Sequence, residues 1–197
     1  MLGERKILQA EIPCGLRSAL IANLRGVEGA IVKEEKMSAS GGLLPDYVNV
    51  KHTYGYPETL RLITDALWEG MRKDGANWIV GAGHGGISIA SILAKDHGLY
   101  LTLVRDRKSG HGMDSWLDGY DRPSVDDRIA FIDDVLNSGK SICEMKSRII
   151  EETDRRGLPH PIVCGAIVVA KRGDGEKLLL DSEIPVVKYL LTREDLL

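Results

Sequence analysis

Short apolar runs alternate with amphipathic stretches along the chain from about residue 56 onward. The apolar runs predict strands over residues 77–81, 100–104, 128–132, 162–170 and 186–191. Between them, apolar residues at helical spacing predict helices over residues 57–72, 87–97 and 140–155. Apolar strands that alternate with helices are typical of a buried parallel sheet. We therefore expect an α/β fold with a Rossmann-like parallel sheet flanked by helices.

Two regions depart from this alternation. Glycines and prolines break the first 55 residues into short pieces, so we expect residues 1–55 to form a small N-terminal hood over one end of the sheet. Residues 56–197 would then form the α/β core of the same single domain. Residues 105–127 are polar and contain glycines, which is typical of a long loop that closes over a substrate.

Composition and charge narrow the class of protein. The chain has 197 residues, of which 43% are hydrophobic and 28% are charged, as in ordinary globular domains. A net charge of −3 argues against a nucleic-acid partner bound through bulk positive charge. The three cysteines lack zinc-ligand or redox spacing, which favours a reducing compartment. We find no apolar signal core and no run long enough to cross a bilayer, so we expect a cytoplasmic protein without a membrane partner.

The strongest chemical signal follows the third predicted strand. Asp133 and Asp134 come directly after the apolar run, and a short turn over residues 137–139 then opens the next helix. A helix start offers unpaired N–H groups and a positive dipole end, which suit a phosphate monoester. Hydroxyls of Ser138 and Ser141 can add donors. Two carboxylates at the exposed end of the strand are placed to accept hydrogen bonds from adjacent ribose hydroxyls, so the segment predicts a sugar-phosphate site.

Two other interpretations of this segment stay open. Asp133 and Asp134 would do no chemistry if they only capped the helix. Alternatively, Gly139, Lys140 and Ser141 match the end of the P-loop pattern G-x-x-x-x-G-K-[ST]. The first glycine of that pattern is Asp134 here, and its carboxylate would face the phosphates that a P-loop wraps.

Two further strand-end turns carry candidate chemistry. Residues 81–88 hold closely spaced glycines, which let a backbone approach an anion at a helix start, although such turns are often only structural. Residues 105–112 are rich in cations and precede the long loop, although a run of this kind is also typical of a solvated surface.

Together these segments resemble the type I phosphoribosyltransferases, which bind phosphoribosyl pyrophosphate (PRPP). Residues 133–141 resemble the PRPP signature, with Asn137 and Lys140 where threonines are more usual. Residues 81–87 resemble the pyrophosphate loop of the family. The resemblance spans about residues 37–191 and implies the type I phosphoribosyltransferase fold with a small hood.

The loop after residue 104 points to the orotate phosphoribosyltransferase branch. Arg105, His111 and Gly112 align with its catalytic loop, whose usual lysine is Ser109 here, with Lys108 one position earlier. Near the N-terminus, Ser40-Gly41 and the tyrosine that follows them resemble the segment that shapes the base pocket. Ala39 stands where a lysine is common, and the nearest lysine is Lys36. Arg172 takes the position of the arginine that contacts the orotate carboxylate.

The resemblance implies three groups of site residues. The expected catalytic residues are Asp133, Asp134, Lys108, His111 and Arg105. The expected PRPP-binding residues are Val135, Leu136, Asn137, Ser138, Gly139, Lys140, Ser141, Gly83, His84 and Gly85. The expected base-binding residues are Ser40, Gly41, Tyr47, Asn137 and Arg172. No protein metal ligand is expected, since Mg²⁺ would be carried with PRPP.

The implied activity is transfer of ribose 5-phosphate from PRPP to a nitrogenous base, with orotate as the first base to test. The small-molecule partners are PRPP and the base, and the resemblance also implies a homodimer in which the loop reaches the neighbouring site. A non-catalytic PRPP-binding regulatory protein is the alternative that Ser109 and Ala39 favour. A purine-type phosphoribosyltransferase and a degenerate P-loop nucleotide binder remain further alternatives.

Overall fold

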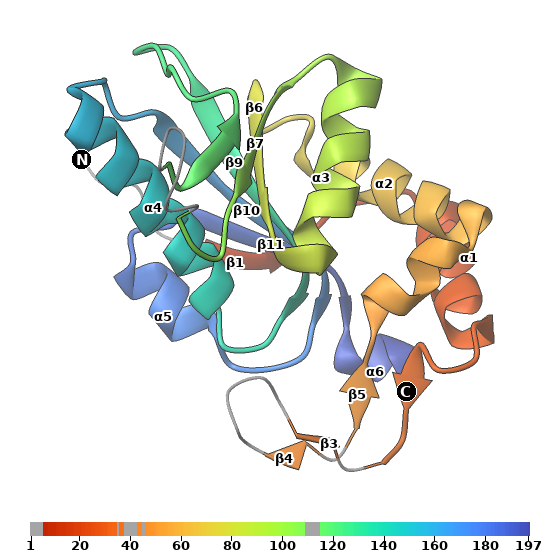
Figure 1. The fold of residues 1–197 in the computed structure, drawn as a ribbon. Helices are drawn as coiled ribbons and strands as arrows, with labels where there is room; N and C mark the ends of the chain where they lie inside the picture. Colours follow the sequence, from red (N-terminus) through yellow and green to blue (C-terminus); the bar gives the residue numbers. More distant parts are fainter. Residues whose placement is uncertain (1–5, 35, 38–42, 45, 109–114) are drawn as a thin grey trace.

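A seven-stranded sheet forms the centre of the molecule. The computed structural model describes residues 6–34, 36–37, 43–44, 46–108 and 115–197. The strands of the sheet are β1 (Lys6–Gln9), β6 (Trp78–Ala82), β7 (Tyr100–Val104), β8 (Leu117–Gly119), β9 (Arg128–Leu136), β10 (Ile162–Lys171) and β11 (Val186–Thr192). They lie in the order β1-β11-β10-β9-β6-β7-β8, and all neighbours are parallel except the β7–β8 pair (Figure 1).

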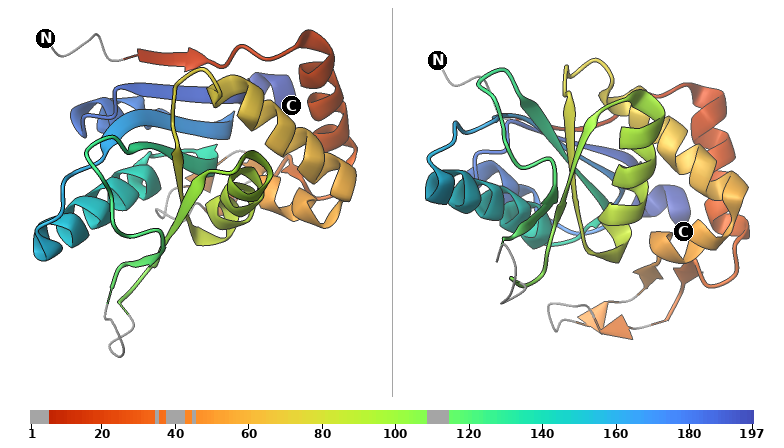
Figure 2. Two further views of the ribbon diagram at one scale, coloured as in Figure 1. Left: turned by 90° about the horizontal axis from the view of Figure 1, so that it is seen from above. Right: turned by 45° about the horizontal axis from the view of Figure 1, so that its top comes forward.

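Helices cover both faces of this sheet. They are α1 (Cys14–Gly26), α2 (Pro57–Met71), α3 (Gly83–His97), α4 (Lys140–Arg156), α5 (Glu176–Asp181) and α6 (Arg193–Leu196). Helices α1, α2 and α3 lie on one side of the sheet, and α4 and α5 lie on the other (Figures 1 and 2). The predicted α/β fold with a flanked, mostly parallel sheet is therefore confirmed. Gly98 ends α3 in the left-handed conformation, with φ of 64°.

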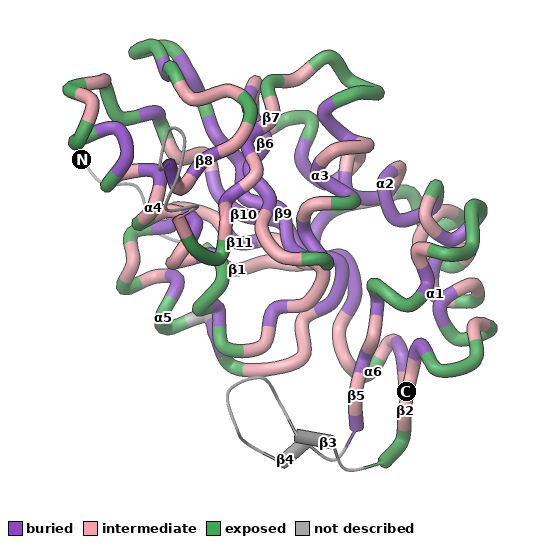
Figure 3. Tube along the Cα trace, viewed as in Figure 1, coloured by how far each residue is buried: buried purple, intermediate pink, exposed green. Residues whose placement is uncertain are grey.

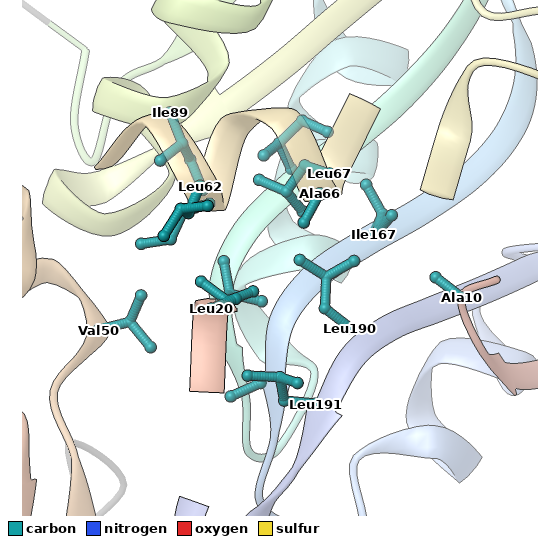
Figure 4. Close-up of a cluster of buried hydrophobic side chains, with 14 of the residues drawn as sticks. Ala10, Leu20, Val50, Leu62, Ala66, Leu67, Ile89, Ile167, Leu190 and Leu191 are labelled. Atoms are coloured by element: carbon teal, nitrogen blue, oxygen red, sulfur yellow. The ribbon is translucent and has the colours of Figure 1, made fainter. Parts of the chain in front are cut away.

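Side-chain alternation along the strands builds one apolar layer on each face. Ile167 and Val169 of β10 pack with α1, α2 and α3, in the cluster that Figure 4 shows around Leu20 and Leu67. Ala166 and Val168 of the same strand pack toward α4 on the opposite face. The strands are therefore buried while the outer sides of the helices stay exposed (Figure 3).

The predicted hood over residues 1–55 is wrong for its first part. Strand β1 belongs to the large sheet and pairs in parallel with β11, and Leu20 and Leu24 of α1 are buried in the core. The later part of this region does form short elements, which lie beyond the carboxyl ends of the parallel strands of the large sheet (Figures 1 and 2). These are β2 (Ile31–Val32), β3 (Lys36–Met37), β4 (Leu43–Leu44), β5 (Tyr47–Val48) and the 3₁₀ helix η1 (Val50–Gly55). Strand β1 was not foreseen because its partner lies at the other end of the chain.

The predicted loop over residues 105–127 includes a strand. Strand β8 pairs antiparallel with β7, and the backbone N–H of Arg105 donates to the carbonyl of Trp116 at 2.9 Å. Three residues that end in glycine show no readable periodicity, so the pattern could not reveal β8. Within the described residues, no helix combines the length and apolar character needed to cross a membrane.

Candidate active site

The paired carboxylates lie inside β9, although the sequence predicted them beyond its end. Strand β9 continues to Leu136 because β10 stays paired with it as far as Lys171. Successive strand residues point to opposite faces, so the two acids separate. The hydroxyl of Ser141 on α4 donates to Asp133, whereas the Asp134 carboxylate lies against Gly85 at the start of α3. The two acids thus stand between two helix starts.

Burial sets the ionisation of Asp133. The residue is 8% exposed, so the predicted exposed position is wrong for it. Loss of solvent raises the pKa of Asp133 well above its ordinary value, and the neighbouring charge of Asp134 raises it further. The hydrogen bond from Ser141 acts in the opposite direction. The backbone N–H of Asp134 also donates to Asp133 Oδ1 at 2.9 Å.

The turn between β9 and α4 forms a pocket of about 350 Å³. Six of the predicted PRPP-binding residues line it, together with Glu144: Val135, Asn137, Ser138, Gly139, Lys140 and Ser141. Gly139 precedes the helix with φ of 76°, and a Cβ there would stand 2.9 Å from the carbonyl oxygen of Gly175. Gly139 provides no side-chain cap for α4, and among the described residues only the N–H of Lys140 has a side-chain acceptor, Ser138 Oγ at 3.5 Å, so the other N–H groups of the first turn are available to an anion.

Leu136 and Glu144 depart from the predicted list. Leu136 is buried in the apolar layer under α4, and its carbonyl accepts from the N–H groups of Arg172 and Gly173. It therefore joins the turn to the loop after β10 and does not face the pocket. Glu144 was missed because an acid on a helix carries no anion-binding signal. Its charge is paired with Lys140 at 3.6 Å and with Arg148 at 3.8 Å.

Two alternative interpretations of this segment fail on its geometry. A P-loop needs a wide turn that starts at Asp134, but Asp134 is a strand residue and only 137–139 connect β9 to α4. The cap-only interpretation fails because α4 has no side-chain cap, and Asp133 accepts from the hydroxyl of Ser141.

The glycines of the predicted pyrophosphate loop lie in the first turn of α3, which begins at Gly83, and they let this segment pack directly on β9. A Cβ on Gly85 would stand 2.4 Å from Asp134 Oδ1, and one on Gly86 would stand 2.7 Å from the carbonyl oxygen of Ile132. Only glycine fits such close approaches. The exposed His84 lies between Gly83 and Gly85. The structure thus places the predicted pyrophosphate loop beside the carboxylates.

Tyr54 is a site residue that the sequence did not reveal. Its hydroxyl donates to the carbonyl of Gly85 at 2.8 Å and so fixes the loop from the side of η1. Burial, followed by the charges of Asp134 and Asp133, raises the pKa of Tyr54 and keeps it a hydrogen-bond donor. The tyrosine belongs to no recognisable motif, so no local signal marked it.

The cationic residues after β7 are engaged elsewhere. Arg105 follows β7 at the carboxyl edge of the sheet, and its Nε lies 2.6 Å from Asp118 Oδ2 of β8. The Nζ of Lys108 contacts Glu151 at 3.0 Å and lies 5.2 Å from the ring centroid of Trp116. At 1.5 Å per residue, Glu151 stands about 16 Å further along α4 than its first residue. The structure therefore does not bring Lys108 to the carboxylates.

The predicted base-binding residues divide into two groups. Arg172 follows β10 and lies beside Asn137, because Gly173 packs against the Asn137 side chain. Its guanidinium is held by Asp46, and the half-buried Tyr47 is the next residue in β5. Ser40 and Gly41 lie outside the described residues, as does the predicted catalytic His111.

Known proteins resemble the chain along most of its length. No family model matches it. The orotate phosphoribosyltransferase of Methanopyrus kandleri is 29% identical over 168 residues, which cover 85% of each chain. That of Pyrobaculum islandicum is 33% identical over 117 residues, which cover 59% of this chain and 60% of the relative.

Solved structures give the same picture of the fold. The crystal structure of the Aeropyrum pernix orotate phosphoribosyltransferase superposes with a TM-score of 0.71 at 22% identity, covering 92% of this chain and 95% of that one. The Mycobacterium tuberculosis enzyme in complex with PRPP has a TM-score of 0.65 at 15% identity, covering 94% and 93% of the two chains.

The fold is that of a type I phosphoribosyltransferase. Within that class, the sequence similarity of the chain lies with the orotate phosphoribosyltransferases, and the resemblance predicted from the sequence is confirmed.

Proposed function

We propose that the chain transfers ribose 5-phosphate from PRPP to a pyrimidine base, with orotate as the substrate, and releases pyrophosphate. One observation carries the proposal: the carboxylates of β9 lie between the starts of α4 and α3, each approached by a glycine-containing turn. Each helix start suits an anion. PRPP carries a phosphate at one end, a diphosphate at the other and a ribose between them.

Each part of the site takes one part of PRPP. The turn over residues 137–141 binds the 5′-phosphate through backbone N–H groups and serine hydroxyls. Asp133 and Asp134 accept hydrogen bonds from the ribose hydroxyls. The first turn of α3, over residues 83–85, binds the diphosphate. As the bond to the leaving group breaks, positive charge develops on the ribose ring, and the nearby carboxylates stabilise it.

Mg²⁺ enters this scheme as part of the substrate. Among the described residues, no cluster of three or more His, Cys, Asp or Glu side chains is arranged to hold a metal ion. Bound to PRPP, Mg²⁺ would neutralise charge on the departing pyrophosphate. In this proposal the carboxylates of β9 face the ribose, and they are the protein groups that could support the bound Mg²⁺.

The direct test is incubation of the protein with Mg²⁺-PRPP and a panel of bases while pyrophosphate release is measured. We expect release with orotate. Release with a purine base alone would instead identify a purine-type enzyme. Stabilisation of the fold by PRPP without release from any base would favour a non-catalytic PRPP-binding regulator, the alternative suggested by Lys108 being held at Glu151.

Replacement of Lys108 by alanine tests whether this lysine serves the reaction. We expect K108A to lower kcat for pyrophosphate release by about tenfold or more if Lys108, which lies away from the carboxylates of its own chain, serves the site of a neighbouring protomer and stabilises the charge that develops on the leaving diphosphate there. The thermal midpoint should hardly change, since the contact with Glu151 is partly exposed and solvent-screened. The exposed neighbour supplies a matched control in R107A. A kcat equal to that of R107A would remove Lys108 from the catalytic residues.

We also propose a homodimer, in which the loop after β7 serves the neighbouring site. Sedimentation equilibrium should give twice the chain mass of 21.6 kDa. Mixing K108A with a variant inactive at Asp133 should then restore part of the activity. A monomeric mass for an active enzyme would exclude this arrangement. The predicted cytoplasmic location stays a prediction.

A further inference from the structure

A buried carboxylate holds the arginine at the base side of the site. The side chains of Asp46 and Arg172 are only 4% and 5% exposed. Asp46 Oδ1 lies 3.3 Å from Nε and 3.2 Å from Nη2 of Arg172, and the backbone carbonyl of Asp46 also accepts from Nη2. One edge of this guanidinium is therefore already occupied by an anion that belongs to the protein.

The same carboxylate has a second cationic partner. Asp46 Oδ2 accepts from Nε of Arg193 at 2.8 Å and from Nη2 of the same side chain. These contacts, from Arg193 first and Arg172 next, hold the pKa of Asp46 below its ordinary value although burial opposes this. Asp46 is thus ionised at neutral pH. Arg193 is far more exposed than its neighbours, with 35% of its side chain accessible.

The position of Arg172 makes this pairing relevant to the base. Its backbone N–H donates to the carbonyl of Leu136, directly before the phosphate turn, and the next residue packs on Asn137. A pyrimidine attached to C1 of a ribose held at Asp133 and Asp134 would lie near this end of β10. A carboxylated base would compete with Asp46 for the guanidinium, whereas an uncharged base would not.

We propose that Asp46 sets the base specificity of the site by neutralising Arg172, which weakens the preference for a carboxylated pyrimidine over an uncharged one. The inference rests on the proposed transferase function and refines it. Asp46 acts through Arg172 and is a positioning and specificity residue. Its removal should change the ratio of two substrates and not only the overall rate.

The test compares kcat/KM for orotate and for uracil at saturating Mg²⁺-PRPP. We expect D46N to raise the orotate-to-uracil ratio at least about tenfold, because a close opposite charge is worth about one to three pKa units and one unit is a factor of ten. R193Q is the matched control, because it breaks the same buried network but leaves Asp46 on Arg172. Its ratio should be no higher than that of the wild type, because Asp46 then pairs with Arg172 alone. An unchanged ratio in a folded D46N would overturn the proposal.

A measurement on the wild-type protein keeps the test decisive if D46N does not fold. Orotate and its 6-carboxamide have nearly the same shape and differ in charge. We expect the neutral carboxamide to bind the PRPP-loaded protein at least as tightly as orotate, by calorimetry. Orotate binding more than tenfold tighter would overturn the inference. Absence of transfer to every base would overturn the proposed function as well, whereas transfer with the wrong ratio overturns the inference alone.

Discussion

D133N is expected to abolish pyrophosphate release and to raise the thermal midpoint of unfolding at neutral pH. The loss of activity follows from the proposed role of Asp133, which accepts from the hydroxyl of Ser141 in the phosphate turn and would accept from a ribose hydroxyl of PRPP. The gain in stability follows from burial, because an ionised carboxylate with a charged neighbour costs free energy in the folded state. Asparagine keeps the shape and an acceptor for Ser141 without the charge.

The stability gain should depend on pH. Burial raises the pKa of Asp133 in the folded protein above its unfolded value, so the folded state holds its proton more tightly. Asp133 therefore lowers the free energy of unfolding as the pH rises above its pKa in the unfolded state. This destabilisation is fully present above its raised pKa in the folded state. We expect D133N to gain at least about 1 kcal/mol at the upper end, which is about 2–4 °C for a chain of this size. The gain should vanish at acid pH, where both states are protonated.

Calorimetric melting at several pH values, with turnover measured alongside, checks this expectation. D126N is a suitable control, because that aspartate is exposed in the turn before β9 and should change neither quantity. The double variant D133N/D134N should also be folded and inactive. Near-normal turnover in the double variant would show that the ribose assignment is wrong. A lower midpoint for D133N at neutral pH would show that hydrogen bonds to the Asp133 carboxylate stabilise its charge more than burial and the neighbouring Asp134 destabilise it.

The features that the sequence revealed are local ones. Strands β9 and β10 contain the apolar runs over residues 129–132 and 166–170, and the turn before α4 combines Gly139 with serines at a helix start, so the sequence could locate the strands and the pocket-lining turn. The sequence predicted that Asp133 and Asp134 belong to the site, but it did not predict that they point to opposite faces of β9. This arrangement depends on β10 staying paired with β9 through Leu136, which extends the strand beyond its apolar run.

The features that the sequence did not reveal depend on distant partners. Strand β1 is recognisable only through β11, 180 positions later in the register Lys6–Val186. Tyr54 acquires its role from Gly85, and Asp46 acquires its role from Arg172 and Arg193. In each case the residue type is unremarkable in its own segment. The roles of such residues depend on tertiary contacts, which the local sequence pattern does not reveal.

G85A is expected to lower kcat/KM for PRPP about a hundredfold, the loss typical of a misplacement of about 1 Å in an active site. The new Cβ would stand 2.4 Å from both the Cγ and the Oδ1 of Asp134, so the carboxylate or the loop must move. The hydroxyl of Tyr54 donates to the carbonyl of Gly85 and so restrains this segment. We therefore expect the side chain of Asp134 to move more than the backbone of Gly85. The groups that bind the ribose and those that bind the diphosphate would then be misplaced relative to each other.

Steady-state kinetics with varied Mg²⁺-PRPP, together with circular dichroism, test this expectation. G55A is the matched control, because Gly55 belongs to η1 with Tyr54 but a Cβ there meets no atom within 4 Å. It should keep its kcat/KM within about twofold, as expected for a surface substitution within about 0.5 kcal/mol. A folded G85A with the kinetics of G55A would mean that the glycine loop tolerates the displacement. The contact between the start of α3 and Asp134 would then have no part in binding PRPP.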